Sequence, residues 1–336
     1  MPLPKNCHTR CDVVLLVDTE TGGHSRSGNF VVETGSVEAQ VLRALRLQHA
    51  RVVVVPYDSD SDVTIAQLQK LKPKLVFNLT EWIDGDRSQD YVITRLLKSL
   101  DLPYTGTADE GLQLARDKVR AKAVVEALGI ATARHFSAGE IGNSRVPYPL
   151  FVKPRHGDGS DAISRAALVQ NRKALNARVK SLRSRKSGLV LCEEYIEGRD
   201  LFVALLGNKP QVMPPLELMV GRQSRGAPRF STRRLKHDES YARRWKISYR
   251  KANLPPSVMT EIRRSSRKIF HALKLRDYAR IDYRLTPDNR LVFIEVNPNP
   301  DLGRHTFGHN LCFADVNYTD LIRRIVSAAR GRFKKK

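Results

Sequence analysis

Two segments near the carboxyl terminus, 280–285 and 291–297, constrain the fold most strongly because apolar and polar residues alternate in both. Side chains along a strand point alternately to opposite faces, so each segment predicts a strand with one buried face. Residues 287–290 have turn chemistry, which joins the strands as an antiparallel hairpin with Asp288-Asn289 as a two-residue loop. This loop sets Asp282 opposite Glu295.

The two faces of this predicted hairpin differ in chemistry. The apolar face would carry Ile281, Tyr283 and Leu285 with Val292, Ile294 and Val296, and the polar face Arg280, Asp282 and Arg284 with Phe293, Glu295 and Asn297. Facing carboxylates repel by ~1 kcal/mol or more, so Asp282 and Glu295 favour a cation between them. Their oxygens, with that of Asn297, suit Mg²⁺. A second interpretation stays open, a solvated face on which Arg280 and Arg284 neutralise the acids.

Apolar patterns elsewhere predict an α/β protein with three domains. Strands at 12–17, 51–57 and 75–79 alternate with helices at 37–48 and 91–100, which predicts a parallel sheet. Further along, helices are predicted at 117–128, 257–273 and 319–329, and strands at 150–154, 189–195 and 201–206. The basic segment 220–249 is irregular, which fits a mobile lid or a disordered insertion. The predicted domains are 1–112, 113–212 and 213–336, the last ending in a basic tail.

Charge and composition narrow the choice of partners. Lys and Arg outnumber Asp and Glu by 58 to 35, a net charge of +23. Such a surface attracts polyanions, although a generally basic surface without a dedicated partner is the simpler interpretation. No apolar run approaches the ~20 residues of a membrane span, and the amino terminus lacks a secretory signal, so a cytoplasmic protein is expected. Cys7-His8 and Cys11 lack a second Cys/His pair, which disfavours a metal site there.

Five stretches, taken in order, resemble the ATP-grasp family in its D-alanine–D-alanine ligase branch. They span roughly residues 75 to 298. The matching stretches are Leu102-Pro-Tyr-Thr-Gly106 with Asp117-Lys118, Phe151-Val-Lys153-Pro, Glu193-Glu194-Tyr-Ile196-Glu-Gly198-Arg-Asp200, Ala-Arg280-Ile-Asp282, and Glu295-Val-Asn297-Pro. The resemblance implies an ATP-grasp fold: an amino-terminal parallel α/β domain, a small central lid domain and a carboxyl-terminal antiparallel-sheet domain.

The resemblance also implies a role for each matching residue. Lys118 and Lys153 would hold phosphates. Glu193 would accept a hydrogen bond from the adenine amino group, and Glu194 and Ile196 would offer backbone groups to the same base. Asp200, where the family usually has Glu, would accept hydrogen bonds from the ribose hydroxyls. Gly157, Gly159 and Ser160 would cover the phosphates, Lys236 would reach the γ-phosphate, and Asp282, Glu295 and Asn297 would hold Mg²⁺, with Mn²⁺ as an alternative. Arg280 would stabilise an oxyanion or grip a substrate carboxylate. Taken without the family, Lys118 is a solvent-facing helix lysine, and Glu193-Glu194 an exposed strand edge.

The implied activity is an ATP-dependent carboxylate–amine ligase that works through an acyl phosphate. Its substrates would be small molecules such as amino acids, and the protein would be a homodimer. The residues after Asn297 depart from the family, because Pro298 to Gly303 replaces the usual Pro-Gly and 304–309 lacks the usual Ser-Leu. Specificity for D-alanine is therefore not carried over.

Two other functions compatible with the sequence compete with the ligase activity. The first is a nucleotide-binding protein that does not ligate, which the intact Asp282, Glu295 and Asn297 disfavour. The second is a basic nucleic-acid-associated protein on the same scaffold. Nucleic acid is not the favoured partner, because no nucleic-acid motif is present and aromatic residues are only 7%.

Overall fold

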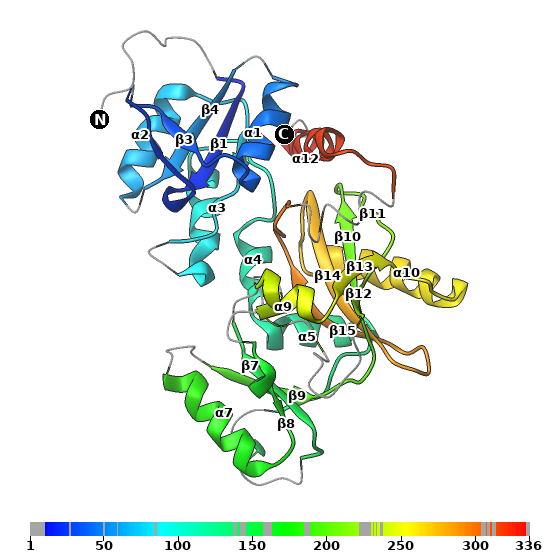
Figure 1. Cartoon of the computed structure of the whole chain (residues 1–336). Helices are drawn as coiled ribbons and strands as arrows, with labels where there is room; N and C mark the ends of the chain where they lie inside the picture. The colour runs from blue at the N-terminus through cyan, green and yellow to red at the C-terminus, as the bar shows by residue number, and fades with distance from the viewer. Residues whose placement is uncertain are drawn as a thin grey trace.

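Three larger sheets and one two-stranded sheet lie in the described part of the chain in the computed structural model (Figure 1). The structure describes residues 11–26, 28–49, 51–58, 60–83, 86–136, 140–141, 146–156, 163–184, 189–221, 230, 232, 234–235, 238–303, 307, 310 and 314–333. The amino-terminal sheet and the small central sheet lie at opposite ends, and the carboxyl-terminal sheet lies between them. No helix in these ranges is long and apolar enough to cross a membrane.

The amino-terminal sheet is parallel, as predicted, with strand order β4-β1-β5. Its elements are β1 (Val13–Asp18), α1 (Val37–Arg46), β4 (Val52–Tyr57), α2 (Ser61–Leu71), β5 (Val76–Asn78) and α3 (Asp90–Ser99), with a small hairpin of β2 (Gly22–His24) and β3 (Phe30–Val32) after β1. Alternate residues of β1 pack into different apolar clusters, Val13 and Leu15 on one side and Val14 and Leu16 on the other. Helices therefore cover both faces, which explains the continuous apolar run of this strand.

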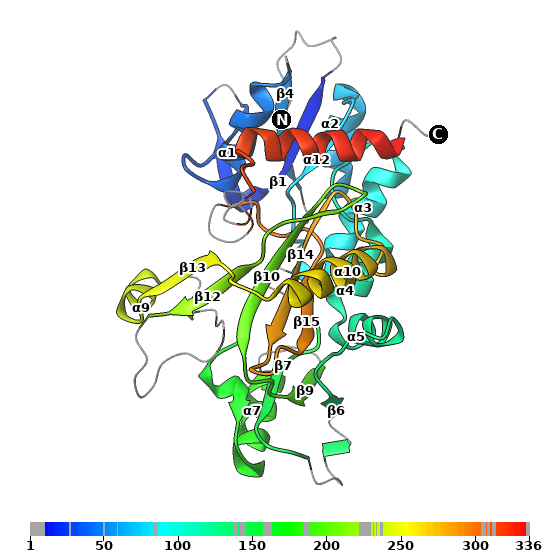
Figure 2. The ribbon, with the colours of Figure 1, turned by 90° about the vertical axis from the view of Figure 1, so that its right-hand side faces the viewer.

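The last described helix, α12 (Tyr318–Phe333), packs into the core of the amino-terminal unit, although it follows the carboxyl-terminal sheet in the sequence. Its buried residues, Leu321, Ile322, Ile325, Val326 and Ala329, join the cluster formed by α1 and β1. Figure 2 shows α12 lying across α1 and β1. The two ends of the chain thus share one core.

The central sheet is antiparallel, with order β6-β9-β7-β8. Helices α4 (Asp109–Arg116) and α5 (Lys118–Ala127) lead to β6 (His135–Phe136), β7 (Leu150–Pro154), β8 (Leu168–Val169), α7 (Arg172–Ser184) and β9 (Val190–Glu194). Leu150, Val152 and Cys192 pack against Leu175 and Leu182 of α7. The opposite face of β7 and β9 is left to a pocket.

The carboxyl-terminal sheet is antiparallel with order β13-β12-β10-β14-β15, and β11 pairs with β10. Its elements are β10 (Arg199–Leu206), β11 (Gln211–Val212), β12 (Leu216–Val220), α9 (Glu239–Arg244), β13 (Ile247–Lys251), α10 (Pro256–Ala272), β14 (Tyr278–Leu285) and β15 (Leu291–Asn297). The prediction of an irregular segment at 220–249 was wrong in part, because α9 and most of β13 lie within it. The many basic residues concealed a strand that pairs with β12 through its backbone.

The hairpin of β14 and β15 has the predicted pairing between 280–282 and 295–297, but the residues nearer the loop pair in a different register. Asp282 faces Glu295 and Arg280 faces Asn297, as expected. The loop is wrong by one residue: Thr286 and Arg290 bond to each other, and Asn289 at φ +64° ends a three-residue loop. A bulge between Asp282 and Tyr283 restores the register.

The bulge also corrects the predicted faces of β15. Phe293 pairs with Tyr283 and is fully buried on the apolar face, where the rings lie 6.4 Å apart. Val292 and Ile294 lie on the other face, in a small cluster with Ala133 and Ile196. The simple alternation predicted from sequence therefore holds only from Glu295 onward.

Sheet membership bears on the predicted domain division, which stays a prediction. Position 112 lies inside α4, and β10, placed before the 212 boundary, pairs along its whole length with β14. We infer that boundaries near 108 and 198 follow the structure better, since both positions lie between elements.

One carboxylate, Asp277, ties three distant segments together. It is completely buried and accepts hydrogen bonds from Gly106 N (2.8 Å) and Asn208 Nδ2 (2.9 Å). Arg332 of α12 completes the cluster with two bonds of 3.0 and 2.7 Å. The amino-terminal unit, the β10–β11 turn and the last helix meet at this residue.

Replacing Asp277 with Ala should lower the free energy of unfolding by about 3–5 kcal/mol, because Arg332 loses its buried counter-ion. Urea denaturation of the variant measures the change. Glu33→Ala, at an exposed position, serves as the control and should shift the midpoint little. A near-wild-type midpoint for Asp277→Ala would show that the cluster contributes little.

Candidate active site

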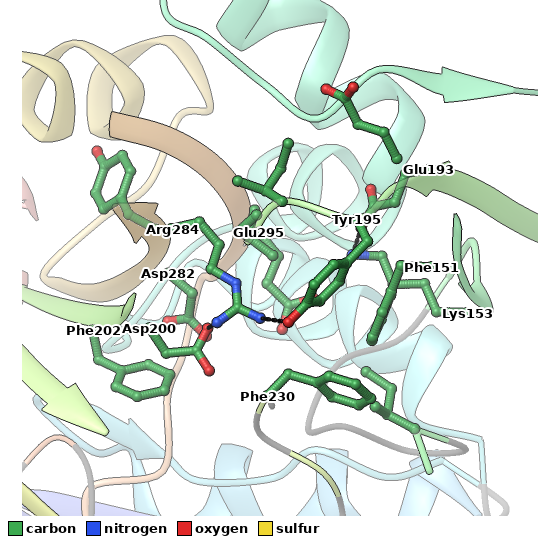
Figure 3. A pocket seen from close by; sticks show the side chains of 15 residues that line it. Phe151, Lys153, Glu193, Tyr195, Asp200, Phe202, Phe230, Asp282, Arg284 and Glu295 are labelled. Atoms are coloured by element: carbon green, nitrogen blue, oxygen red, sulfur yellow. Dashed lines mark hydrogen bonds and ion pairs between the residues drawn. The ribbon is translucent and has the colours of Figure 1, made fainter. Parts of the chain in front are cut away.

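A pocket lies between the central and carboxyl-terminal sheets (Figure 3). The cavity itself is small, about 80 Å³, and it opens to solvent. The central sheet and the segment that follows it contribute Phe151, Lys153, Glu193, Glu194, Tyr195 and Ile196; the carboxyl-terminal sheet contributes Asp200, Phe202, Asp282, Tyr283, Arg284, Ile294 and Glu295; Ile163 and Phe230 complete the lining. The mixture of apolar, aromatic and charged groups fits a small-molecule site.

The buried carboxylate of Glu193 faces two ammonium groups. Its Oε1 lies 2.7 Å from Lys153 Nζ, and its Oε2 lies 3.2 Å from Lys122 Nζ, with all three side chains nearly inaccessible. Burial alone would raise the pKa of Glu193, but the two lysines outweigh it and hold this pKa below its usual value. Burial and the charge of Lys153 lower the pKa of Lys122. Oε2 lacks a well-directed hydrogen bond among the described residues, so it can still accept one.

The facing acids of the hairpin lie in the same pocket. Asp282 is gripped by Arg280 through two bonds of 2.7 and 3.0 Å, so the arginine does neutralise an acid, but on a buried face rather than a solvated one. The Arg280 guanidinium also lies 5.5 Å from the ring centre of Phe202. Burial would lower the pKa of Lys153, but Glu193 and, to a smaller extent, Glu295 and Asp282 outweigh it and raise this pKa. The two walls are therefore coupled electrostatically.

Most predicted site residues meet in this pocket, and a few do not. Lys153, Glu193, Glu194, Ile196, Asp200, Asp282 and Glu295 line it. Asn297 and Arg280 are buried two residues further along the hairpin from Glu295 and Asp282, and Lys118 is buried at the start of α5 rather than solvent-facing. Gly157, Gly159, Ser160 and Lys236 lie outside the described residues.

Sequence reasoning missed two charged groups at this site: Lys122, which pairs with Glu193 behind the pocket wall, and Arg284, which lines the pocket. Lys122 lies one helical turn after Lys118, and this i, i+4 spacing could have placed both lysines on one face of α5. Arg284 received no role at the site, and one of the two open interpretations placed it on a solvated face, yet it is only 5% exposed and contacts Asp200 at 2.9 Å. Nothing in the sequence distinguishes a buried arginine on this strand from an exposed one.

A third missed group lies at the carboxyl end of β1. Asp18 is buried and accepts hydrogen bonds from the backbone N–H groups of Glu81 and Trp82. Burial raises its pKa to about 6 despite these bonds. Ligands of parallel α/β sheets bind beyond the carboxyl ends of the strands, so Asp18 marks that edge of the amino-terminal unit.

Comparison with known proteins agrees with this geometry. Residues 127–327 match the family model described as the D-ala D-ala ligase C-terminus. The chain is 32% identical over 273 residues to the uncharacterized protein y4sG of Sinorhizobium fredii, covering 77% of this chain and 75% of that protein. It is 28% identical over 285 residues to the D-alanine–D-alanine ligase of Aquifex aeolicus, covering 84% and 89%.

Solved structures agree on the fold. The D-alanine–D-alanine ligase of Bacillus anthracis complexed with ATP superposes with a TM-score of 0.70 at 16% identity, covering 97% of this chain and 99% of that one. The sheets and the pocket between them thus define an ATP-grasp protein. The chain belongs to the D-alanine–D-alanine ligase family. It is accordingly an ATP-dependent carboxylate–amine ligase.

The Glu193 cluster makes a prediction about stability. Glu193→Gln should lower the free energy of unfolding by about 3–5 kcal/mol, because it leaves two buried ammoniums without an anion. Lys122→Met should cost less, since one ion pair survives. The double variant should be more stable than Glu193→Gln alone. Urea denaturation of all four proteins checks this, and strictly additive effects would contradict the proposed coupling.

Asp18 makes a prediction about pH. The pKa of Asp18 is about 6 in the folded protein and about 3.9 in an unfolded chain, so the folded protein binds the proton more tightly. The protonated side chain therefore contributes its full stabilisation of the fold below pH ~4, and this contribution is lost as the pH rises through 6. The free energy of unfolding of Asp18→Asn, measured relative to that of the wild type, should therefore rise by about 2 kcal/mol between pH 4 and pH 8. Parallel denaturation curves across this range measure the difference. A constant offset between the two proteins would count against an elevated pKa.

Proposed function

We propose that the pocket binds ATP between the two sheets and activates a substrate carboxylate as an acyl phosphate for attack by an amine. The observation that carries the proposal is the convergence of two charge groups on one pocket. Lys153 with Glu193 forms one wall, and Asp282 with Glu295 forms the other. Cations next to facing carboxylates suit a metal-bound triphosphate.

The base of ATP is proposed to lie against β9 and the segment after it. Glu193 Oε2 can still accept a hydrogen bond, which suits the adenine amino group. The N–H of Glu194 is already donated to Arg134 O, so Glu194 would offer its carbonyl oxygen and Ile196 its N–H. Asp200 would accept from the ribose hydroxyls. Lys153 and Lys118 would hold phosphate oxygens as point charges.

The donor set of the hairpin fits Mg²⁺ or Mn²⁺. Asp282, Glu295 and Asn297 supply oxygens, and Asn297 would bind the ion through Oδ1. Asn297 Nδ2 is a donor that is buried without a hydrogen-bond partner among the described residues, so it would be able to donate to a phosphate oxygen. A carboxylate has about four acceptor positions, so the Arg280 pair leaves Asp282 able to bind a metal. No three His, Cys, Asp or Glu side chains in the described ranges form a metal site alone, which leaves phosphate oxygens to complete the shell. The ion would offset charge on the transferring phosphoryl group.

The proposed reaction has two steps. A substrate carboxylate oxygen bonds to the γ-phosphorus of ATP, and ADP leaves. The amine nitrogen then bonds to the acyl carbon, loses a proton, and the phosphate group leaves. Arg280 is fixed between Asp282 and the Phe202 ring, so its guanidinium would stabilise negative charge on the acyl oxygen without reorganising. Lys236 would approach the γ-phosphate, and Gly157, Gly159 and Ser160 would cover the phosphates.

The substrates are proposed to be small molecules of the amino-acid class, since the relatives named above include D-alanine–D-alanine ligases. Departures from the family after Asn297 leave the identity of both substrates open. A homodimer and a cytoplasmic location remain predictions from sequence.

Phosphate and ADP release with pooled amino acids tests the proposal. Glu295→Gln should reduce turnover at least about 100-fold, because it removes one of the two charged metal ligands. Glu110→Gln, an exposed residue paired with Lys274, should retain wild-type turnover. EDTA should abolish wild-type activity, and added Mg²⁺ or Mn²⁺ should restore it. Full activity of Glu295→Gln would overturn the metal assignment.

A further inference from the structure

We propose that Arg284 is a positioning residue that holds Asp200 in place for the ribose and so makes nucleotide selection depend on the ribose hydroxyls. This inference rests on the proposed ATP site. It concerns a residue that neither the sequence patterns nor the family resemblance singled out.

Arg284 makes contacts that fix its guanidinium completely. Nη1 lies 2.9 Å from Asp200 Oδ1 and donates to Gly198 O at 3.0 Å, while Nη2 donates to Tyr195 Oη at 3.3 Å. The guanidinium carbon also lies 5.4 Å from the centre of the Tyr195 ring. Figure 3 shows the three side chains converging in the pocket. A planar group with several fixed donors can make these contacts together, whereas a lysine ammonium could not.

Backbone geometry places the pair precisely. Asp200 of β10 lies directly opposite Arg284 of β14, so the two side chains share one face of the sheet. Gly198, at φ +153°, packs so closely against Leu285 that an added Cβ would lie 2.2 Å from Leu285 O. The segment leading into β10 is therefore held against β14 by backbone packing as well as by Arg284.

Both partners line the pocket and are largely buried, with side-chain exposures of 6% for Arg284 and 17% for Asp200. An ion pair at this depth loses little strength to solvent, unlike a surface pair. Asp200 Oδ1 lies 2.9 Å from Arg284 Nη1, and a carboxylate offers about four acceptor positions in all. The pair thus suits a preorganised acceptor, because the aspartate is short and its direction is set by the arginine.

A purely structural role would have a different signature. If Arg284 only stabilised the segment from Tyr195 to Gly198, its loss would weaken the binding of all nucleotides equally. If it positions Asp200, its loss should weaken ligands that carry ribose hydroxyls and spare those that lack them. The ratio of two affinities separates these roles, whereas a single affinity does not.

Isothermal titration calorimetry with the Mg²⁺ complexes of ATP, 2′-deoxyATP and 3′-deoxyATP provides the test. The wild type should bind ATP about 10- to 100-fold more tightly than at least one deoxy analogue, as expected for hydrogen bonds to a charged group. Arg284→Met and Asp200→Asn should each reduce this ratio to about 3-fold or less. Their effects on deoxynucleotide binding should be small.

Three further proteins complete the design. Arg284→Lys keeps the charge but loses the fork, so its ratio should fall between those of the wild type and Arg284→Met. Arg290→Met, at an exposed position of the same hairpin, is the matched control and should keep the wild-type ratio. The double variant of Asp200→Asn and Arg284→Met should lose no more discrimination than either single variant.

The outcomes distinguish this inference from the proposed function. An unchanged ratio in Arg284→Met and Arg284→Lys, or equal weakening of all three nucleotides, would overturn the positioning role while leaving the ATP site intact. Failure of the wild type to bind any of the nucleotides would overturn both. Thermal unfolding of each variant verifies folding, and Arg284→Lys keeps the test decisive if Arg284→Met does not fold.

Discussion

The site depends on one buried carboxylate that faces two ammonium groups. Glu193 of β9 meets Lys153 of β7 and Lys122 of α5, and Lys122 also lies 5.9 Å from the ring centre of Phe293 on β15. Burying charged groups is costly, so the cluster persists only while all three remain together. It fixes the central sheet relative to α5 and the hairpin, and with them the pocket between the sheets.

The pairing of Asp282 with Glu295 was predictable from sequence, although the reasoning behind it contained two errors that cancel. Asp288-Asn289 was taken as a two-residue loop, but the loop has three residues, which shifts the register by one. The bulge at Asp282/Tyr283 shifts it back. Turn chemistry allows both loops, and a bulge leaves no mark in an alternating sequence. The contrast between the two faces therefore predicted the pairing correctly only at the Asp282–Glu295 end of the hairpin.

What the sequence could not reveal depends on contacts between distant segments. The parallel sheet was predictable because the strand-length apolar runs of β1, β4 and β5 alternate with helical patterns. Strand β13 was not, since Arg250 and Lys251 obscure its pattern and backbone pairing with β12 stabilises it. The pairing of Arg280 with an acid of the hairpin was one of two interpretations that the sequence left open, but nothing in the sequence indicated that the pair would be buried. Lys122 and Arg284 are long cations of the kind normally found on surfaces, and only their partners explain their burial.

The shared core of α12 and α1 bears on how the chain is made. A ribosome releases the amino-terminal sheet well before α12, yet Leu321, Ile325 and Ala329 belong to the same cluster as Val13 and Leu15. Arg332, which pairs with the buried Asp277, also lies in α12. We therefore expect the first-made sheet to stay incomplete, with one apolar face uncovered, until α12 has emerged. Folding of the amino-terminal unit then waits for a helix that is made about 300 residues later.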